Sequence, residues 1–255
     1  MLISVVTVCL NSISTIGDTL ASVAVQRDAN VEHIVIDGGS TDGTLDMLHR
    51  HGGRIATLVS EPDQGLFDAM NKGLRRATGD VVGFLNSDDV YADDSVLREV
   101  AALFESSDAD ACYADLLYVA ADDLTHVVRY WKSCDYRPGL LRRGWMPAHP
   151  TFFCRREVLQ RVGGFDPAYG LHADFELMVR LFHTQRIRAI YVPRIWIRMR
   201  TGGASNRSVG NILRGNRESL RALHDHGIAV SVAGFVLGKL ALRVPQFLAR
   251  PRRSS

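Results

Sequence analysis

Residues 33–44 read HIVIDGGSTDGT, an apolar run that stops at Asp37 and gives way to a glycine-rich turn. Two other stretches end in the same manner, residues 59–65 (VSEPDQG) and residues 81–89 (VVGFLNSDD). Amphipathic helical patterns separate these runs, and apolar strands that alternate with helices are typical of βαβ units. We therefore predict an α/β fold with a mostly parallel, Rossmann-like central sheet that is flanked by helices.

The same reading extends along the chain. Strands are expected at residues 3–10, 33–36, 55–60, 81–85, 111–118 and 187–192. Helices are expected at residues 19–27, 45–51, 65–77, 95–105, 157–162 and 174–183. Residues 119–150 read as irregular and basic. No repeat or low-complexity linker is present, which favours one α/β domain followed by a C-terminal extension.

Charge is distributed unevenly along the 255 residues, although Lys+Arg 30 nearly balance Asp+Glu 28. Residues 1–128 carry 7 basic and 21 acidic side chains, whereas residues 129–255 carry 23 basic and 7 acidic ones. A basic half attracts polyanions or an anionic membrane surface. The alternative is that opposite charges face each other within one fold, and the sequence leaves both open.

Composition excludes several classes of protein. A hydrophobic content of 46% in a chain of this length supports a core without cross-links, and excludes collagen, coiled coil and wholesale disorder. The four cysteines form no C-x-x-C pair, which indicates a reducing compartment and no zinc ribbon. The N-terminus lacks the features of a secretory signal. The longest uncharged apolar stretch, residues 227–238, is too short to span a membrane.

Polar residues cluster where the expected strands stop. In an open parallel sheet, ligands bind beyond the carboxyl ends of the strands, so the three acidic turns should border a single crevice. The spacing of Gly38 and Gly43 resembles a P-loop, but Thr44 stands where that motif requires Lys, and no G-x-G-x-x-G follows the first strand. Residues 86–89 (NSDD) instead offer oxygen ligands suited to Mg²⁺ or Mn²⁺ bridging phosphates.

Six motifs together carry a resemblance to a known family. They are SVVTVCLNS at residues 4–12, IDGGSTDGT at 36–44, EPDQGLFDAMNKGLRRATGDVVGFLNSDD at 61–89, HPTFFCRREVLQRVGGFD at 149–166, ADFELMVRL at 173–181 and TGGAS at 201–205. In this order they resemble the bacterial family 2 glycosyltransferases of the GT-A fold, which are nucleotide-sugar-dependent and inverting. The run PDQGLFDAMNKG is similar to the subgroup that builds capsular, exopolysaccharide or glycolipid sugars.

The resemblance implies a donor site in the first part of the chain. The implied nucleotide-binding residues are Thr7, Asn11, Asp37, Asp63, Gly65, Lys72 and Ser87. Lys72 has a simpler alternative, an i, i+4 ion pair with Asp68. The implied metal ligands are Asp88 first and Asp89 second, the latter as a ligand through water or as a partner of a ligand, together with Asn86. Asn86 departs from the family's D-x-D pattern, because it offers a carbonyl oxygen without a charge.

The resemblance also implies the acceptor side. Asp174 matches the general base, with Ala173 in place of a common Glu, and Glu176 is expected to point elsewhere on the helix. The implied acceptor or diphosphate contacts are His149, His172, Arg200, Gly203 and Ser205. For His149 and His172 the alternative is a hydrogen-bonded structural role, and for Arg198, Arg200 and residues 201–205 it is an ordinary loop.

Residues 1–205 are accordingly expected to form the catalytic domain, with a donor part (1–94) and an acceptor part (95–205). Residues 206–255 are expected to form a helical, membrane-associating extension. In that extension Lys239, Arg243, Gln246 and Arg250 would form one polar stripe of an interfacial helix, and packing on the catalytic domain is the alternative. The expected location is the cytoplasm, peripheral on the inner face of the cell membrane.

The expected partners are a nucleoside-diphosphate sugar and a saccharide or polyprenyl-linked acceptor, with an anionic membrane surface and no nucleic acid. Two other functions remain as alternatives. One is a sugar-nucleotide nucleotidyltransferase, which usually carries a glycine-rich basic loop that residues 9–20 lack. The other is a non-catalytic nucleotide-binding protein of the same fold. The sequence does not identify the base, the sugar, the acceptor or the oligomeric state.

Overall fold

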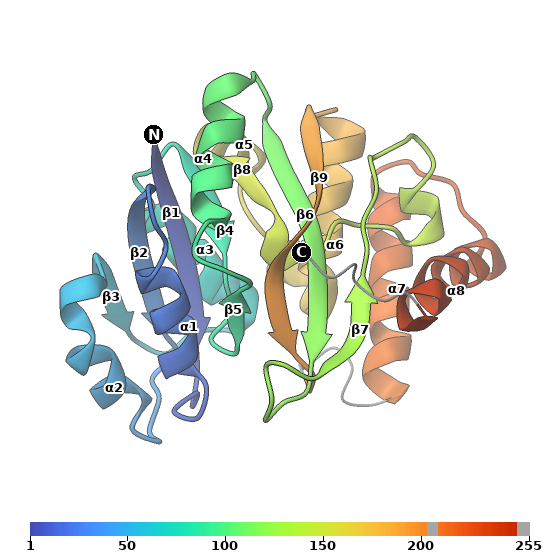
Figure 1. Ribbon diagram of the computed structural model, residues 1–255. Helices are drawn as coiled ribbons and strands as arrows, with labels where there is room; N and C mark the ends of the chain where they lie inside the picture. Colours follow the sequence, from blue (N-terminus) through green and yellow to red (C-terminus); the bar gives the residue numbers. More distant parts are fainter. Residues whose placement is uncertain (203–208, 249–255) are drawn as a thin grey trace.

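The computed structural model of the chain describes residues 1–202 and 209–248. Nine strands in these residues form one mixed sheet with the order β3-β2-β1-β4-β8-β6-β9-β5, and β7 pairs with β6 (Figure 1). The strands are β1 (Leu2–Cys9), β2 (Asn30–Asp37), β3 (Thr57–Ser60), β4 (Val81–Phe84), β5 (Asp89–Tyr91), β6 (Ala111–Val119), β7 (Val127–Trp131), β8 (Phe153–Arg155) and β9 (Ala189–Arg200). The predicted α/β class is confirmed.

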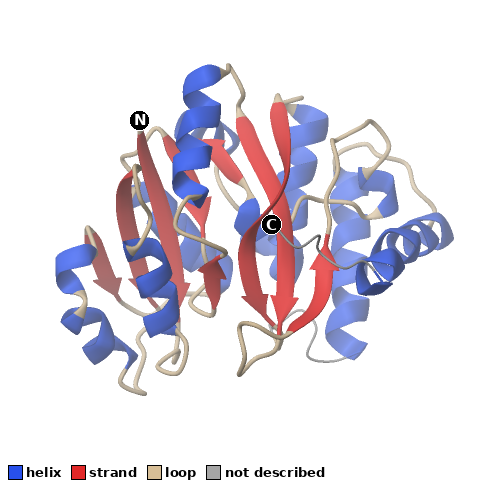
Figure 2. Ribbon diagram, in the orientation of Figure 1, coloured by secondary structure: helices blue, strands red, loops and turns tan. Residues whose placement is uncertain are grey.

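Helices cover both faces of this sheet (Figure 2). The α-helices are α1 (Ile16–Ala24), α2 (Thr44–Arg50), α3 (Leu66–Arg76), α4 (Val96–Ser106), α5 (Arg156–Val162), α6 (Ala173–Val179), α7 (Val209–Asp225) and α8 (Val232–Leu248). Short 3₁₀ turns are η1 (Gly52–Arg54), η2 (Leu141–Arg143), η3 (His149–Thr151) and η4 (Pro167–His172), and α6 continues into a π-helical turn, η5 (Arg180–Thr184).

The β1 strand shows why the sequence folds in this way. Val6 and Val8 enter the core cluster beneath α3, whereas Ile3 and Val5 enter the cluster beneath α4, as the period of two in a strand requires. All four side chains are almost completely buried. Burial of one such side chain contributes roughly 1.5–3 kcal/mol, so a run that is apolar on both faces favours a central strand.

The parallel pairs β1–β2, β1–β4 and β2–β3 bring the carboxyl ends of these strands to one edge of the sheet. The strand β9 runs parallel to β6, and its last residues pair with β5 immediately after the turn at residues 86–89. This register brings Arg200 beside the acidic turn, although more than a hundred residues separate the two in sequence.

Two predictions about local structure were wrong. Residues 119–150 are not wholly irregular, because β7 pairs with the end of β6 and its side chains are only partly buried, which gave the sequence no clear strand pattern. Arg198 and Arg200 do not lie in a loop, because β9 continues through Arg200. The strand was underestimated because Pro193 and the arginines interrupt its apolar pattern.

Candidate active site

The carboxylate of Asp37 organises the glycine-rich turn after β2. It is completely buried and accepts hydrogen bonds from the Ser40 hydroxyl (2.5 Å), the Ser60 hydroxyl (2.6 Å) and the backbone N–H groups of Gly39 and Ser40. Burial alone would raise the pKa of Asp37, but these hydrogen bonds outweigh it and lower the pKa below its ordinary value. Asp37 therefore remains ionised, and it fixes the turn that borders the donor side.

Loops from three strands join at this edge. Asn11 adopts a left-handed conformation (φ 50°), and its side-chain oxygen accepts a hydrogen bond from the Thr41 N–H at 2.9 Å. The hydroxyls of Ser12 and Ser87 lie 2.9 Å apart, which connects the turn after β1 to the acidic turn after β4. Thr7 lies deeper, where its buried hydroxyl contacts His33 Nε2 at 3.0 Å.

The turn after β3 closes the same side of the site. Asp63 accepts a hydrogen bond from the Gly65 N–H (2.8 Å), and its other oxygen lies against Gly38, where a Cβ atom would be only 2.5 Å away. Gly38 therefore permits the two turns to touch. The alternative for Lys72 is confirmed, because its ammonium group pairs with Glu61 (3.0 Å) and with Asp68 (3.7 Å). A nucleotide contact of Lys72 stays a prediction.

The acidic turn holds two buried oxygens that have no hydrogen-bond partner among the described residues. Asn86 donates to Asp89 Oδ2 at 3.0 Å, while Asn86 Oδ1 and Asp89 Oδ1 are buried and unsatisfied. Burial, followed by the charge of Asp88, raises the pKa of Asp89 well above its ordinary value. Unsatisfied buried oxygens are rare and costly, and a cation would satisfy them.

The donor set at residues 86–89 therefore fits a hard divalent cation. Among the described residues, no group of three or more acidic, histidine or cysteine side chains is assembled to hold a metal. Mg²⁺ bound with a nucleotide is commonly held by one or two carboxylates, while substrate phosphates and water complete the shell.

Arg200 secures the backbone of the acidic turn. Its guanidinium pairs with Asp18 (2.5 Å) and donates to the carbonyl oxygens of Asp88 (2.9 Å) and Ala121 (3.1 Å). Arg200 is only 8% exposed, so its guanidinium makes these contacts in a largely buried position. Gly203 and Ser205, which the resemblance implies as substrate contacts together with Arg200, lie outside the described residues.

Asp174 stands at the start of α6, where burial raises the pKa of its carboxyl to about 6, against weaker lowering effects of the Phe175 N–H, Lys239 and Arg243. Such a pKa suits a general base near neutral pH. Glu176 serves another purpose, as predicted, because it is 2% exposed, forms an ion pair with Arg180 (2.6 Å) and lies 2.8 Å from His226 Nε2.

Tyr118 connects the two acidic centres. The charges of both Asp89 and Asp174 act on its hydroxyl, together with those of Arg129 and Arg243, while burial is the main cause of its raised pKa. The Tyr118 ring stacks on Trp131 with centroids 6.2 Å apart, and Arg129 lies 4.7 Å from its centroid. Asp89 and Asp174 therefore both lie within electrostatic reach of Tyr118. Sequence reasoning missed Tyr118 and Arg129, which carry no motif.

The two candidate histidines are held differently. His149 packs between Phe84 and Phe165, and burial lowers its pKa to about 4. His172 Nδ1 lies 2.8 Å from the Ser219 hydroxyl, and burial, followed by Lys239 and Arg243, lowers its pKa to about 4. Both are neutral at pH 7, so neither could supply positive charge to a diphosphate there. The contact with Ser219 agrees with the hydrogen-bonded structural alternative for His172, and contact of either residue with substrate stays a prediction.

The polar face of α8 points toward the rest of the protein, whereas we expected this face at a membrane surface from the sequence. Lys239, Arg243 and Gln246 face the domain: Lys239 donates to Asn216 (2.6 Å), and Gln246 accepts from Arg129 (2.9 Å). The expectation that this stripe lies against lipid headgroups was wrong, because the stripe finds charged and polar partners on β7 and α7. The apolar residues Leu237, Leu240, Val244 and Phe247 are exposed instead, by 66%, 52%, 55% and 62%. Arg250 lies outside the described residues.

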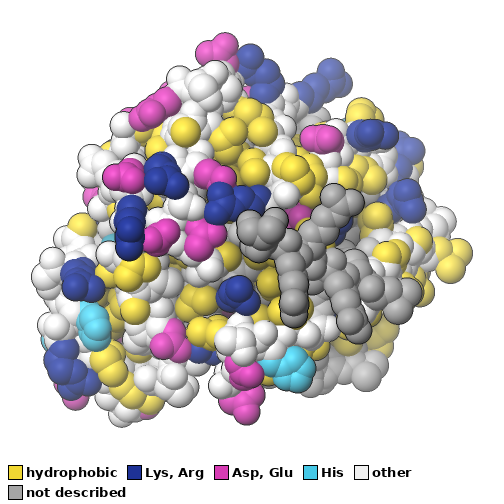
Figure 3. Space-filling view, viewed as in Figure 1, with side chains coloured by type: hydrophobic (Ala, Val, Ile, Leu, Met, Phe, Trp, Pro, Cys, Tyr) yellow, Lys and Arg dark blue, Asp and Glu magenta, His cyan; other side chains and the backbone are white. Residues whose placement is uncertain are grey.

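Hydrophobic side chains are visible on the end of the molecule that α8 forms (Figure 3). In the part of the chain that the structure describes, no helix combines the length and the apolar character needed to cross a bilayer.

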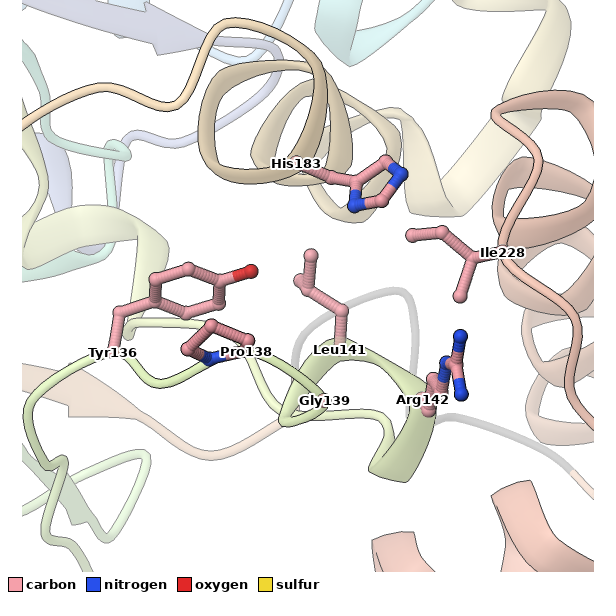
Figure 4. A pocket seen from close by; sticks show the side chains of 7 residues that line it. All are labelled: Tyr136, Pro138, Gly139, Leu141, Arg142, His183 and Ile228. Carbon is pink, nitrogen blue, oxygen red and sulfur yellow. The ribbon is translucent and has the colours of Figure 1, made fainter.

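A cavity of about 350 Å³ lies away from these residues (Figure 4). It is lined by Tyr136, Pro138, Gly139, Leu141, Arg142, His183 and Ile228. The described residues that line it include no candidate site residue and no carboxylate. It is not the candidate active site.

The family model for glycosyl transferase family 2 matches residues 4–163, more than half of the chain. The chain belongs to this family. As a family 2 member it is a glycosyltransferase, as predicted, and the nucleotidyltransferase alternative is set aside. An uncharacterised glycosyltransferase of Mycobacterium tuberculosis is 33% identical over 181 residues, which cover 70% of this chain and 68% of the relative. A PGL/p-HBAD biosynthesis glycosyltransferase of Mycobacterium bovis is 29% identical over 193 residues, covering 74% and 73%.

Solved structures confirm the GT-A fold of this family 2 transferase. Staphylococcus aureus TarS (residues 1–349) in complex with UDP-GlcNAc superposes with a TM-score of 0.68 and 17% identity, covering 95% of this chain and 71% of TarS. A mannosyltransferase of Pyrobaculum calidifontis in complex with GDP-Man and Mn²⁺ gives a TM-score of 0.59 and 20% identity, covering 96% and 81%.

Proposed function

We propose that this family 2 transferase moves a sugar from a nucleoside-diphosphate sugar to a saccharide or lipid-linked acceptor with inversion, in the synthesis of a cell-surface polysaccharide or glycolipid. The observation that carries the proposal is the position of Tyr118, which lies within electrostatic reach of both the acidic turn and Asp174. A donor diphosphate at Asp88 and an acceptor at Asp174 could therefore react within one site.

The proposed transfer step uses one carboxylate on the acceptor side, that of Asp174. The acceptor hydroxyl forms a bond to the anomeric carbon as the bond from that carbon to the diphosphate oxygen breaks, and the electron pair leaves with the nucleoside diphosphate. Asp174 takes the hydroxyl proton. Because Glu176 is engaged by Arg180 and His226, the segment offers no second free carboxylate for a covalent intermediate. A single displacement with inversion is therefore favoured.

On the donor side, Asn86, Asp88 and Asp89 would hold Mg²⁺ or Mn²⁺. The bound ion would neutralise charge that develops on the departing diphosphate. Arg200 holds the Asp88 backbone in place, and the Asp37-centred turn would position the nucleoside. The names of relatives and structural neighbours support this reading: one relative acts in PGL/p-HBAD biosynthesis, and two neighbours bind UDP-GlcNAc or GDP-Man.

We place the enzyme at a membrane surface, through the exposed apolar stripe of α8. We also keep the division into a catalytic domain at residues 1–205 and a membrane-associating extension at residues 206–255. In this arrangement α8 has two functions, because one face packs beside Asp174 and the opposite face contacts lipid.

A thermal-shift panel of UDP, GDP and dTDP, each with and without Mn²⁺, tests donor binding. A ligand at a hundred times its Kd stabilises the folded state by about 2.7 kcal/mol, which raises the Tm measurably. We expect one nucleoside diphosphate to raise the Tm, and more so with Mn²⁺. If none changes the Tm with or without the metal, the proposed donor class is wrong.

A further inference from the structure

Three cationic side chains converge on a small pocket between α6, β7 and α8. Arg129, Lys239 and Arg243 line it together with His172, Trp131 and Trp145, and no carboxylate is among the described lining residues. Each cation is partly buried, and burial is the main cause of a lowered pKa in all three, that of Lys239 falling to about 8. Cations removed from water in this way are costly unless an anion accompanies them.

The partners that the chain provides do not balance these charges. Arg129 contacts the neutral amide of Gln246 and the rings of Tyr118, Trp131 and Phe247. Lys239 donates to the neutral amide of Asn216 at 2.6 Å. Within the described residues Arg243 forms no ion pair or hydrogen bond, and the anion acting on it and on Lys239 is Asp174.

One carboxylate against three cations leaves the pocket positively charged. The cations could serve only to keep Asp174 ionised, but Arg129 argues against this, because Asp174 is not among the groups that shift its pKa. An additional anion is therefore the simplest partner for the cluster.

The size of the pocket and its surroundings narrow the class of anion. Its volume is about 40 Å³, the room of a few water molecules, which suits a phosphoryl group better than a sugar ring. The opposite face of the same helix exposes Leu237, Leu240, Val244 and Phe247. Because a helix is about 10 Å across, a phosphate in the pocket and a lipid chain along the outer face are within reach of one molecule.

We propose that Arg129, Lys239 and Arg243 form a phosphate subsite for a lipid-borne acceptor, and that the subsite holds the acceptor phosphate beside Asp174. The inference rests on the proposed function, in which Asp174 deprotonates the acceptor. It adds that the acceptor is a saccharide carried on a lipid phosphate, with a sugar hydroxyl that Asp174 deprotonates, and it names the residues that recognise the phosphate.

The experiment titrates the full chain with geranyl phosphate, a soluble short-chain lipid phosphate, and follows the fluorescence of Trp131 and Trp145 in the pocket. The nucleoside diphosphate selected by the thermal-shift panel is kept saturating with Mn²⁺, so that the donor site is occupied. We expect geranyl phosphate to bind at least about tenfold more tightly than inorganic phosphate or geraniol. Arg243→Gln and Lys239→Gln should each weaken binding about tenfold or more, since each removes a charge-assisted contact.

Two variants make the result specific. Arg243→Lys keeps the charge and should retain most of the binding, which separates loss of charge from loss of fold. Arg217→Gln removes an exposed charge on α7 and should bind geranyl phosphate as the wild type does. Nucleoside diphosphate binding, measured in the same variants, should be unchanged, and it reports separately on the proposed function.

Three results would overturn the subsite. The first is unchanged geranyl phosphate binding in Arg243→Gln and Lys239→Gln. The second is equal binding of geraniol and geranyl phosphate, which would mean that the protein recognises only the hydrocarbon part of the lipid. The third is binding to phosphatidylcholine vesicles that contain phosphatidylglycerol, weakened by Arg243→Gln, without binding of geranyl phosphate. That outcome would assign the pocket to a phospholipid headgroup instead of an acceptor.

Discussion

The ammonium group of Lys239 on α8 lies within electrostatic reach of the Asp174 carboxylate on α6, and each charge favours the ionised form of the other. Lys239 lowers the pKa of Asp174, which burial raises, and Asp174 raises the pKa of Lys239, which burial lowers. The C-terminal helix is therefore a wall of the candidate active site and not only an appendage.

Replacing Lys239 should change the pH dependence of transfer. Lys239→Met removes a positive charge that lowers the Asp174 pKa, so the pH at which the rate is half-maximal should move upward. The measurement is kcat against pH in both proteins. Arg217→Gln is the matched control and should not shift the profile. An unchanged midpoint in Lys239→Met would show that the two groups do not interact in the enzyme.

In the wild type, a base with a pKa of about 6 defines the acidic limb of the profile. Asp174 acts only when ionised, so kcat should fall about tenfold for each pH unit below that value and level off above it. The pKa of about 6 lies between pH 5 and pH 7. A rate that stays constant over this pH range would therefore exclude Asp174 as the base.

The acidic turn should determine the response to metal. Asp88→Asn removes the charge of the residue predicted to be the main metal ligand, while it keeps the shape of the turn. Mn²⁺ should then add little to the Tm increase that the nucleoside diphosphate causes. Asp94→Asn, a change at an acid in an exposed ion pair with Arg27, is the control. Full turnover in excess EDTA would refute the metal role of Asp88.

Glu176 should matter for stability and not for proton transfer. Its carboxylate is buried against Arg180 and His226, and removing one partner of a buried pair typically costs about 3–5 kcal/mol. Glu176→Gln should therefore lower the free energy of unfolding in urea by about 3 kcal/mol. Glu157→Gln, at an exposed acid on α5, should have little effect. A Glu176→Gln protein as stable as the Glu157→Gln protein would contradict the assignment.

Membrane contact should depend on the outer face of α8. Leu237→Ser combined with Val244→Ser should reduce co-sedimentation with phosphatidylglycerol vesicles, because both side chains are more than half exposed and the change removes apolar surface without disturbing the inner stripe. Leu213→Ser on α7, at a leucine that is 64% exposed, is the control. Equal sedimentation of the double variant and the control would place any membrane contact elsewhere.

Much of the fold and part of the site could be predicted from the sequence. The runs at residues 34–36 and 81–84 carry no polar side chain, which favours strands covered on both faces. Their carboxyl ends therefore had to meet at one edge, and Asp37 and residues 86–89 were found there. The separation of Asp174 from Glu176 followed from helical geometry in the same way, and the buried ion pairs of Glu176 agree with it.

The orientation of α8 could not be predicted, because an amphipathic pattern defines two faces but not which one faces the protein. Lys239 and Arg243 face inward because other elements supply their partners. Lys239 donates a hydrogen bond to Asn216, and Arg243 lies within electrostatic reach of Tyr118 and Asp174. Tyr118 and Arg129 were missed for a related reason. Their stacking with Trp131 depends on the β6–β7 register, in a region without a clear strand pattern.

The central claim is that Asp174 deprotonates the acceptor while a nucleotide-sugar donor is bound at the acidic turn. Release of nucleoside diphosphate from the bound donor, in the presence of acceptor, tests it most directly in the wild type and in Asp174→Asn. We predict that Asp174→Asn binds the donor normally but releases nucleoside diphosphate about 10²–10⁴-fold more slowly, the usual contribution of a general base. Release at the wild-type rate by Asp174→Asn would contradict the account.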